Sequence, residues 1–143
     1  MQTIHIGSDH AGTELKRFLL EELRKLGYQT VDHGCSGAES CDYALIAHPL
    51  CESVLAGNDR GILICGTGLG MSMAANRHEG IRAALCGVEI MARLARAHND
   101  ANVLCLGARI IGRELALAIV VAFLEGGFEG GRHARRIGQI EIN

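Results

Sequence analysis

Apolar and polar positions alternate along the chain in two rhythms, which predict a regular succession of strands and helices. Short apolar runs bounded by glycine are typical of buried strands, and Gly-Ile-Leu-Ile-Cys at 61–65 is the clearest of them. Longer segments repeat apolar residues every three or four positions, as on one helix face. We expect strands at 3–7, 29–32, 61–65, 81–85 and 103–106, and helices at 12–26, 43–56, 72–77, 88–97 and 113–124.

This alternation predicts an α/β fold, with one doubly wound domain spanning 1–143 and a five-stranded parallel sheet covered by helices on both faces. The common order for five such strands is 2-1-3-4-5. Pro49 lies inside the second expected helix, so that helix is predicted to start late or to kink. The tail, 125–143, is rich in glycine and arginine and is expected to wrap around the domain rather than join its core.

Composition narrows the class of protein. Apolar residues make up 48% and charged residues 21% of the 143 positions, as in an ordinary globular domain. A net charge of −2 offers no basic field, so we expect neither nucleic acid nor a membrane as a partner. The longest apolar stretch, 115–124, is shorter than the roughly 20 residues that span a bilayer. Met1 leads directly into a strand pattern and not into a signal peptide, so a cytoplasmic location is expected.

The cysteines do not follow the spacing of a metal site. None of the six forms a C-x-x-C pair, and none is grouped with histidine as in a zinc site. We therefore expect no metal, no disulfide framework and mostly free thiols that pack as small apolar side chains. The cysteines stand at 35, 41, 51, 65, 86 and 105.

The strand order places the expected site between the first and third strands. Ligands of open parallel sheets bind at the carboxyl ends of the strands, where the strand order reverses. Ser8-Asp9-His10 follows the first strand, and a segment from Cys65 to Gly70 ends the third. Both carry reactive or polar side chains at the same predicted edge.

Alternating glycines at 66, 68 and 70 predict a turn whose backbone N–H groups converge on one point. Such a turn can hold a phosphate, a carboxylate or a developing oxyanion, and the following helix adds its positive end. The segment lacks the Gly-Lys-Ser/Thr of a P-loop, and Met71 stands where a dinucleotide fingerprint needs glycine. The alternative is a tight turn without a ligand.

Cys65 and Thr67 flank this turn and have two interpretations each. A thiol near a helix start can act as a nucleophile or a base, whereas a buried cysteine at a strand end is more often inert. Thr67 could donate a hydrogen bond to a carbonyl oxygen or could only satisfy the turn.

Further polar candidates follow later in the chain. His98 and Asn99 form a polar cluster before the last strand, which we expect at the carboxyl side of the sheet, although a helix-capping histidine is the simpler interpretation. Arg132 and Arg136 would share one face of a helix, a geometry that suits a phosphate, unless they belong to a solvated terminus. Arg109 is a third candidate of this kind.

Together these motifs resemble the B type of ribose-5-phosphate isomerase, a family that includes galactose-6-phosphate and allose-6-phosphate isomerases. The resemblance runs almost end to end. It is carried by Gly-Ser-Asp-His-Ala-Gly at 7–12, Asp-Tyr at 42–43, the strand and glycine turn at 61–70, Ala-Ala-Asn at 74–76, His-Asn-Asp-Ala-Asn-Val at 98–103 and Glu-Gly-Gly-Arg-His at 129–133.

The resemblance implies a Rossmann-like fold, no cofactor and an aldose–ketose isomerase that passes through an enediolate. Cys65 would be the base that moves a proton between C1 and C2, and Thr67 would assist at the oxygens. The backbone amides of Gly66, Gly68, Leu69 and Gly70 would hold the oxyanion. A positioned base and preorganised donors are what this chemistry needs.

The resemblance also assigns substrate contacts and a partner. Asp9 would contact sugar hydroxyls, Tyr43 would line the sugar pocket, and His98 would open the furanose ring beside Asn99. The phosphate would be bound by His10, Arg109, Arg132 and Arg136. A homodimer or a dimer of dimers is implied, with active sites at the interface and the tail at 125–143 contacting the partner subunit.

One departure leaves alternatives open. The family usually has proline after Asp-Tyr, and here Ala44 follows. This difference bears on the sugar more than on the reaction. The favoured substrate is ribose 5-phosphate, with allose 6-phosphate or galactose 6-phosphate as the rivals. A binding module without catalysis is the alternative from another class, and a thiol redox protein is disfavoured by the missing C-x-x-C.

Overall fold

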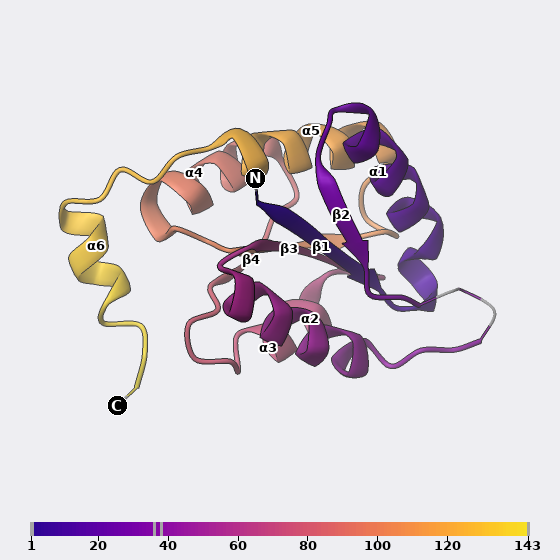
Figure 1. Cartoon of the computed structure of the whole chain (residues 1–143), viewed down its shortest axis with the longest axis horizontal. Helices are drawn as coiled ribbons and strands as arrows, with labels where there is room; N and C mark the ends of the chain where they lie inside the picture. The colour runs from indigo at the N-terminus through magenta and orange to yellow at the C-terminus, as the bar shows by residue number, and fades with distance from the viewer. Residues whose placement is uncertain (1, 36, 38, 143) are drawn as a thin grey trace.

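The computed structural model describes residues 2–35, 37 and 39–142 of the chain as a three-layer α/β domain (Figure 1). The parallel sheet contains β1 (Thr3–Ser8), β2 (Gln29–Asp32), β3 (Arg60–Cys65), β4 (Ala83–Leu85) and β5 (Val103–Gly107). The helices are η1 (His10–Gly12), α1 (Thr13–Lys25), α2 (Tyr43–Gly57), α3 (Leu69–Ala75), α4 (Glu89–Asn99), α5 (Arg113–Glu125) and α6 (Arg132–Ile137).

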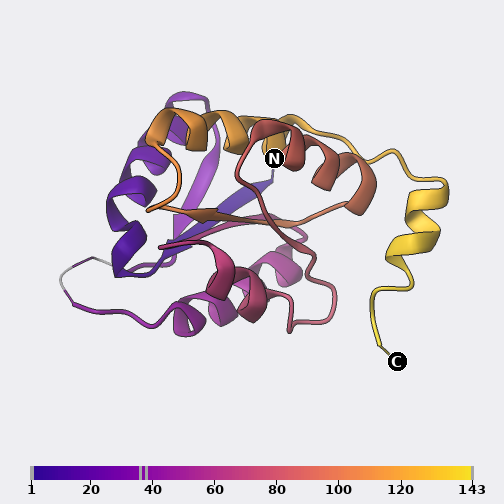
Figure 2. The ribbon, with the colours of Figure 1, turned by 180° about the vertical axis from the view of Figure 1, so that it is seen from behind.

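Alternate residues of the central strands divide the core in two. Ile62 and Ile64 of β3 face one cluster with α1, α4 and α5, whereas Leu63 and Cys65 face the other with α2 and α3. This division follows from the two-residue repeat of a strand, and it explains why β3 is apolar along nearly its whole length. Figures 1 and 2 show the same two layers on opposite sides of the sheet.

The strand order is β2-β1-β3-β5-β4, so the predicted order 2-1-3-4-5 is wrong in its last two places. β5 lies beside β3 because its five residues are all buried and need neighbours on both sides. The short β4, Ala-Ala-Leu, is only half-buried and forms the edge. The predicted five-stranded parallel sheet with helices on both faces is confirmed, as is the strand reversal between β1 and β3.

Several element boundaries differ from the predicted ones. α2 begins at Tyr43 and contains Pro49 within its length, so the helix does not start late. α3 begins at Leu69, inside the glycine segment, and not near Ser72. None of the helices in the described part of the chain is both long and apolar enough to cross a membrane.

The C-terminal segment leaves the domain at α6 and returns to it near the end of the chain, where the N–H of Gly80 donates to Oε1 of Glu141 at 3.0 Å. After α5 the chain passes the end of α4, where the N–H of Glu129 donates to the carbonyl oxygen of Ala97 at 3.0 Å. α6 then projects beyond the sheet, as Figures 1 and 2 show from both sides. In α6 the side chain of His133 is buried, while its arginines are exposed.

Candidate active site

The ends of β1 and β3 bring Asp9 and Cys65 together, as the sequence predicted. Ser8 pairs with Ile64 in the parallel register, and the N–H of Asp9 donates to the carbonyl oxygen of Ile64 at 3.0 Å. Asp9 caps η1, because its Oδ1 accepts the N–H of Ala11 at 2.9 Å. Both side chains are nearly buried, so the sheet fixes their positions before any ligand binds.

The glycine turn folds back over the thiol of Cys65. The N–H of Gly68 donates to Sγ of Cys65 at 3.1 Å, and the N–H of Leu69 donates to Oγ1 of Thr67 at 3.2 Å. Gly68 has φ +82°, and a Cβ there would lie 2.5 Å from Cδ1 of Leu85, so only glycine fits. The hydroxyl of Thr67 keeps its own proton for a further acceptor.

The side chains of Tyr43 and Arg109 both lie against this turn. A Cβ at Gly70 would lie 2.6 Å from Cε1 of Tyr43, which means that the ring packs on the turn backbone. A Cβ at Gly66 would lie 3.3 Å from Nη1 of Arg109, and the N–H of Arg109 donates to the carbonyl oxygen of Gly66 at 2.9 Å. Arg109 therefore supplies an exposed positive charge beside Cys65.

His10 stands at the same edge, in η1, and is exposed. Its Nδ1 lies 3.3 Å from the backbone nitrogen of Cys41. Cys41 is bonded to Cys35 in a disulfide, whose two Cα atoms lie 6.3 Å apart. The expectation of free thiols is therefore wrong for this pair, because the loop after β2 returns on itself and brings the two cysteines together.

The other cysteines differ from Cys65 in their surroundings. Burial, with a smaller effect of Glu52, raises the pKa of the Cys51 thiol to about 12. Burial raises the pKa of Cys86 to about 11 and the pKa of Cys105 well above its ordinary value. These three thiols remain neutral near pH 7 and have the role of core residues. Cys65 is the free cysteine whose sulfur accepts a hydrogen bond from the glycine turn.

His98 and Asn99 lie at the opposite edge of the sheet, so their expected placement at its carboxyl side is wrong. They end α4, which runs back towards the starts of the strands. Three residues later, the carbonyl oxygen of Asn102 accepts the N–H of Gly61 at 2.9 Å, at the start of β3. A segment that precedes a parallel strand lies at its amino end, so one chain does not bring His98 to Cys65.

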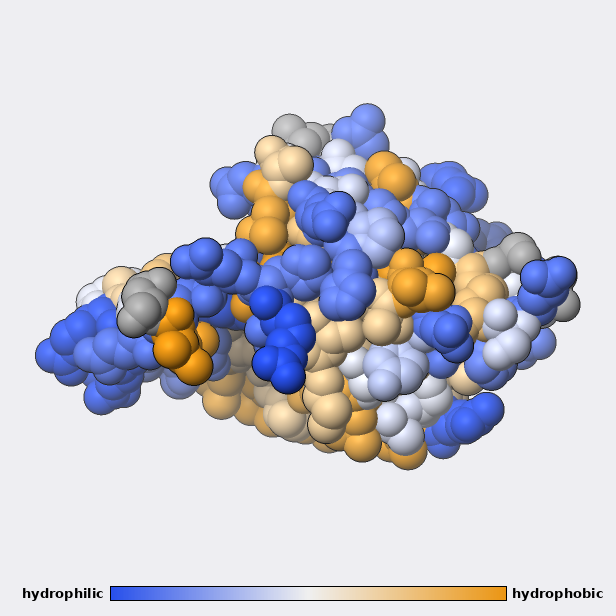
Figure 3. All heavy atoms as spheres, turned by 90° about the horizontal axis from the view of Figure 1, so that it is seen from below, coloured by the Kyte–Doolittle hydropathy of each residue, from blue (hydrophilic) through white to orange (hydrophobic). Residues whose placement is uncertain are grey.

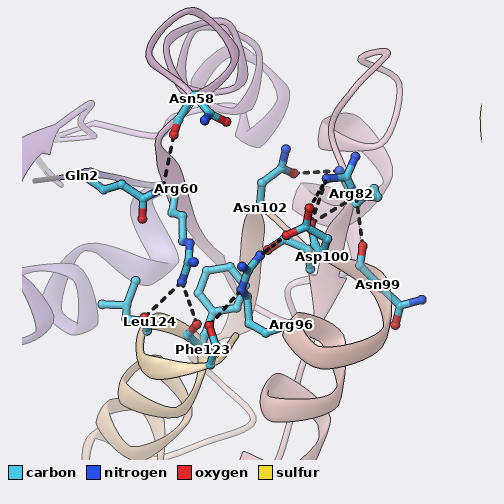
Figure 4. Close-up of polar contacts among 12 residues, drawn as sticks. Gln2, Asn58, Arg60, Arg82, Arg96, Asn99, Asp100, Asn102, Phe123 and Leu124 are labelled. Carbon is cyan, nitrogen blue, oxygen red and sulfur yellow. Dashed lines mark hydrogen bonds and ion pairs between the residues drawn. The ribbon is translucent and has the colours of Figure 1, made fainter. Parts of the chain in front are cut away.

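An arginine network, which the sequence did not predict, holds the chain at this amino edge (Figure 4). Arg96 is buried and donates to Oδ1 of Asp100 at 2.8 Å and to the carbonyl oxygen of Ala101 at 2.7 Å. Arg82 donates to the carbonyl oxygens of Asn99 and Asp100, each at 2.9 Å. Asp100 has φ +46°, and these contacts fix that uncommon conformation.

His98 is paired with the C-terminal segment. Its ring stacks on that of His133, with centroids 4.3 Å apart and planes 9° from parallel. Oxygens of Glu129 lie 3.9 Å from Nε2 of His98 and 3.5 Å from Nε2 of His133. Burial lowers the pKa of His133, and the positive charges of His98, Arg132 and Arg136 act in the same direction, while Glu129 opposes them.

Arg132 and Arg136 both belong to α6, so the condition for a shared helix face is met. They lie with His98 and Asn99 on the side of the molecule away from Cys65. The sequence-predicted residues thus form two groups within one chain. One group contains Asp9, His10, Tyr43, Arg109 and the segment Cys65 to Gly70, and the other contains His98, Asn99, Arg132 and Arg136.

The fold and the thiol-bearing edge place the chain among α/β proteins whose ligands bind where the strand order reverses. A model of the family described as Ribose/Galactose Isomerase matches residues 4–140. The chain is 45% identical over 138 residues to ribose-5-phosphate isomerase B of Escherichia coli (strain K12), a match that covers 96% of this chain and 93% of that protein.

Solved structures agree with this match. The ribose-5-phosphate isomerase B of Clostridium thermocellum superposes with a TM-score of 0.95 at 52% identity, covering 97% of this chain and 95% of that one. The enzyme of Mycoplasma genitalium, solved with bound ribulose-5-phosphate, gives 0.93 at 44% identity, covering 96% and 93%. This chain belongs to the ribose/galactose isomerase family, and the resemblance seen in its motifs is confirmed.

Proposed function

We propose that this chain is an aldose–ketose isomerase that interconverts ribose 5-phosphate and ribulose 5-phosphate. The observation that carries the proposal is a free thiol, Cys65, held beside a turn of backbone donors at the strand reversal of a chain from this family. The family fixes the class of chemistry, and the edge supplies a base and donors in the right place.

The reaction moves one proton from C2 to C1 and one from the C2 hydroxyl to the C1 oxygen, and it leaves the substrate's overall oxidation state unchanged. In the open-chain aldose, Cys65 as a thiolate takes the proton from C2, and the C1 carbonyl oxygen becomes an enediolate oxygen. The thiol then returns the proton to C1, while the proton of the C2 hydroxyl passes to the C1 oxygen and the C2 oxygen becomes the ketone. The amides of Gly68 and Leu69 already donate within the turn, so the hydroxyl of Thr67 and the other amides of the turn are left to stabilise the oxygen charge, a contribution of roughly 3–4 kcal/mol for each good donor.

The groups around this thiol take up the remainder of the substrate. Asp9 is fixed by its cap contact and offers its second carboxylate oxygen to sugar hydroxyls. The exposed ring of Tyr43 lines the sugar pocket, and His10 and Arg109 provide charge for the phosphate. The positions of these side chains at one edge support the proposed roles.

The site is completed by a second copy of the chain. His98 and Asn99 would lie beside Cys65 of the partner subunit and open the furanose ring of the substrate bound there. Arg132 and Arg136 would bind the phosphate of the same substrate. Two observations support this arrangement. The two groups lie at opposite edges of one chain, and α6, which carries the arginines, projects beyond the sheet of its own domain (Figures 1 and 2).

Exposed apolar side chains at the carboxyl edge supply a surface for that second copy. Met91 and Ile110 are 48% and 68% exposed and line one hollow with Thr67, and Leu69 in the same turn is 49% exposed. Monomeric proteins rarely leave clustered apolar side chains in water. Figure 3 shows apolar surface gathered along one margin of the face seen from the α2–α3 side, while the C-terminal segment is largely polar. A homodimer, or a dimer of dimers, in the cytoplasm is the assembly we propose.

A comparison of substrates tests the proposal. The purified chain is assayed with ribose 5-phosphate, allose 6-phosphate and galactose 6-phosphate, and we expect the highest kcat/KM for the five-carbon sugar. An equal or higher value for a six-carbon sugar would overturn the substrate assignment, for which Ala44 is the first residue to examine. Binding of all three without turnover would favour the non-catalytic module.

A further inference from the structure

The C-terminal segment builds a compact group of ligand-type side chains around His98. His98 ends α4, Glu129 lies between α5 and α6, and His133 lies in α6. One nitrogen or oxygen from each side chain lies within 4.8 Å of the other two. Among the residues that the structure describes, this is the one group of three or more such side chains that converges in this way.

Backbone hydrogen bonds hold the segments that carry this group of three side chains. The N–H of Glu129 donates to the carbonyl oxygen of Ala97, in the last turn of α4, at 3.0 Å. The N–H of His133 donates to the carbonyl oxygen of Gly130 at 3.1 Å. The first contact places Glu129 beside the last turn of α4, and the second fixes the start of α6, whose His133 ring stacks on that of His98.

His133 supplies a second, independent sign of a ligand. Its side chain is 92% buried, and its Nε2 has no hydrogen-bond partner within the described part of the chain. The nearest acceptor, Oε1 of Glu129, is 3.5 Å away, beyond the usual length of a good hydrogen bond. A buried polar nitrogen without a partner is unfavourable, and a bound ligand would supply the missing contact.

The chemistry of the group matches a borderline divalent cation. Two imidazoles and one carboxylate are the protein ligands of one common type of zinc site, which leaves a fourth position open. Zinc holds such nitrogen and oxygen atoms at about 2.0–2.2 Å, so the three ligand atoms must approach one another by up to about 1.5 Å. Glu129 is 56% exposed and His98 is 37% exposed, and both can make this movement while His133 stays fixed.

We propose that His98, Glu129 and His133 form a binding site for a divalent cation of the zinc type, and that its occupation inhibits the enzyme. The second half rests on the proposed function. In the proposed function the imidazole of His98 exchanges a proton with the sugar during ring opening, and a metal ion bound to that ring would block the exchange. The nearby charges of Arg132 and Arg136 oppose a cation, which favours reversible binding.

The binding test uses the full chain with Zn²⁺ alone as the probe, in competition with a chromophoric chelator. We expect one ion per chain at this site. Glu129→Gln and His133→Gln should each weaken binding by more than tenfold, since even loss of an outer supporting contact costs about 10–100-fold. Glu129 is exposed, so its variant remains informative if the buried His133 variant does not fold.

Matched controls separate this site from the other histidines and the thiols. Nδ1 of His48 lies 2.7 Å from Nε2 of His78 in a second histidine pair, so His48→Gln should leave the affinity unchanged. Co²⁺ in place of Zn²⁺ should give visible bands of nitrogen and oxygen ligation. A sulfur-to-cobalt band lost in Cys65→Ser, or a Zn²⁺ affinity unaffected by Glu129→Gln, would overturn the proposed site.

Activity forms a separate arm of the experiment. Zn²⁺ should inhibit the wild-type isomerase, a chelator should restore it, and Glu129→Gln should require at least tenfold more Zn²⁺ for the same inhibition. If Zn²⁺ occupies the site and the isomerisation rate stays unchanged, the proposed inhibition is overturned. Absence of isomerase activity towards every sugar phosphate would refute the proposed function, and the binding arm would still decide the site.

Discussion

The two edges of the sheet are built in different ways. At the carboxyl edge, backbone geometry positions the polar groups. Parallel pairing places Asp9 next to Cys65, and the N–H of Gly68 in the glycine turn donates to the sulfur of Cys65. At the amino edge, long side chains position the backbone, because Arg82 and Arg96 donate hydrogen bonds to carbonyl oxygens at and beside Asp100. The first edge offers a base and donors, whereas the second offers histidine, amide and arginine side chains.

In the function proposed above, each edge is half of a site. The carboxyl edge has few positive charges for a phosphate, and the amino edge has no thiol in the described residues around His98. Two copies related by a twofold axis would complete two such sites, since each copy gives one edge and receives the other. The predictions below separate the contributions of the two edges.

The largest effect is expected at the carboxyl edge. Cys65→Ala removes the proposed base, and we expect kcat to fall by roughly 10²–10⁴-fold or more while sugar-phosphate binding is largely retained. Steady-state kinetics and calorimetry measure the two quantities. Cys51→Ala is the matched control, because that thiol is buried with a raised pKa and should affect stability and not kcat. Full activity in Cys65→Ala would remove the thiol from the mechanism.

The next effect belongs to the amino edge. Arg132→Ala and Arg136→Ala each remove a charge-assisted contact of about 1.5–3 kcal/mol, so KM should rise roughly 10–150-fold with a smaller change in kcat. Arg135→Ala, in the same helix, is the control for general loss of charge. If all three variants raise KM equally, α6 acts through its total charge and not through two defined contacts.

The smallest effect concerns a polar chain that joins β1 to the start of β3 and the end of β2. His5 lies between Asp59, 3.0 Å from its Nε2, and His33, 2.9 Å from its Nδ1. The hydrogen bond from His5 lowers the pKa of Asp59, aided by the N–H of Thr3, and burial lowers the pKa of His33, aided by His5.

Both shifts have the same sign for stability. A lowered pKa means that the folded state favours the unprotonated form, so this stability is present at neutral pH and is lost on acidification. The loss should begin below about pH 6.5 for His33 and below about pH 4 for Asp59. Urea midpoints against pH measure it, and Asp59→Asn, at a cost of about 1 kcal/mol at pH 7, should flatten the lower part of the curve. An unchanged curve would show that Asp59 does not contribute.

The sequence predicted the carboxyl edge well because its signals are local. The apolar run at 61–65 and the glycines after it specify a strand followed by a tight turn, and the strand reversal brings Asp9 to Cys65. The strand order was mispredicted because chain order does not tell which strand is central. The fully buried 103–107 run was the available signal.

The amino edge was predicted poorly because it depends on contacts distant in sequence. Arg82 donates to the backbone carbonyl oxygens of residues 99 and 100, and no local pattern in the sequence predicts those hydrogen bonds. The disulfide between Cys35 and Cys41 depends on the path of a loop and not on a spacing motif. The position of His98 could have been deduced, because a helix that leads into a parallel strand ends at the amino side of the sheet.

Mixed assemblies of two inactive variants test the central claim most directly. Cys65→Ala chains and His98→Ala chains are unfolded together, refolded as a mixture and assayed. If each site takes Cys65 from one copy and His98 from the other, half of the dimers are mixed and one of their two sites is intact. The expected activity is then about a quarter of the wild-type value. If the mixture forms mixed dimers and remains as inactive as its two components, the site does not combine the two edges.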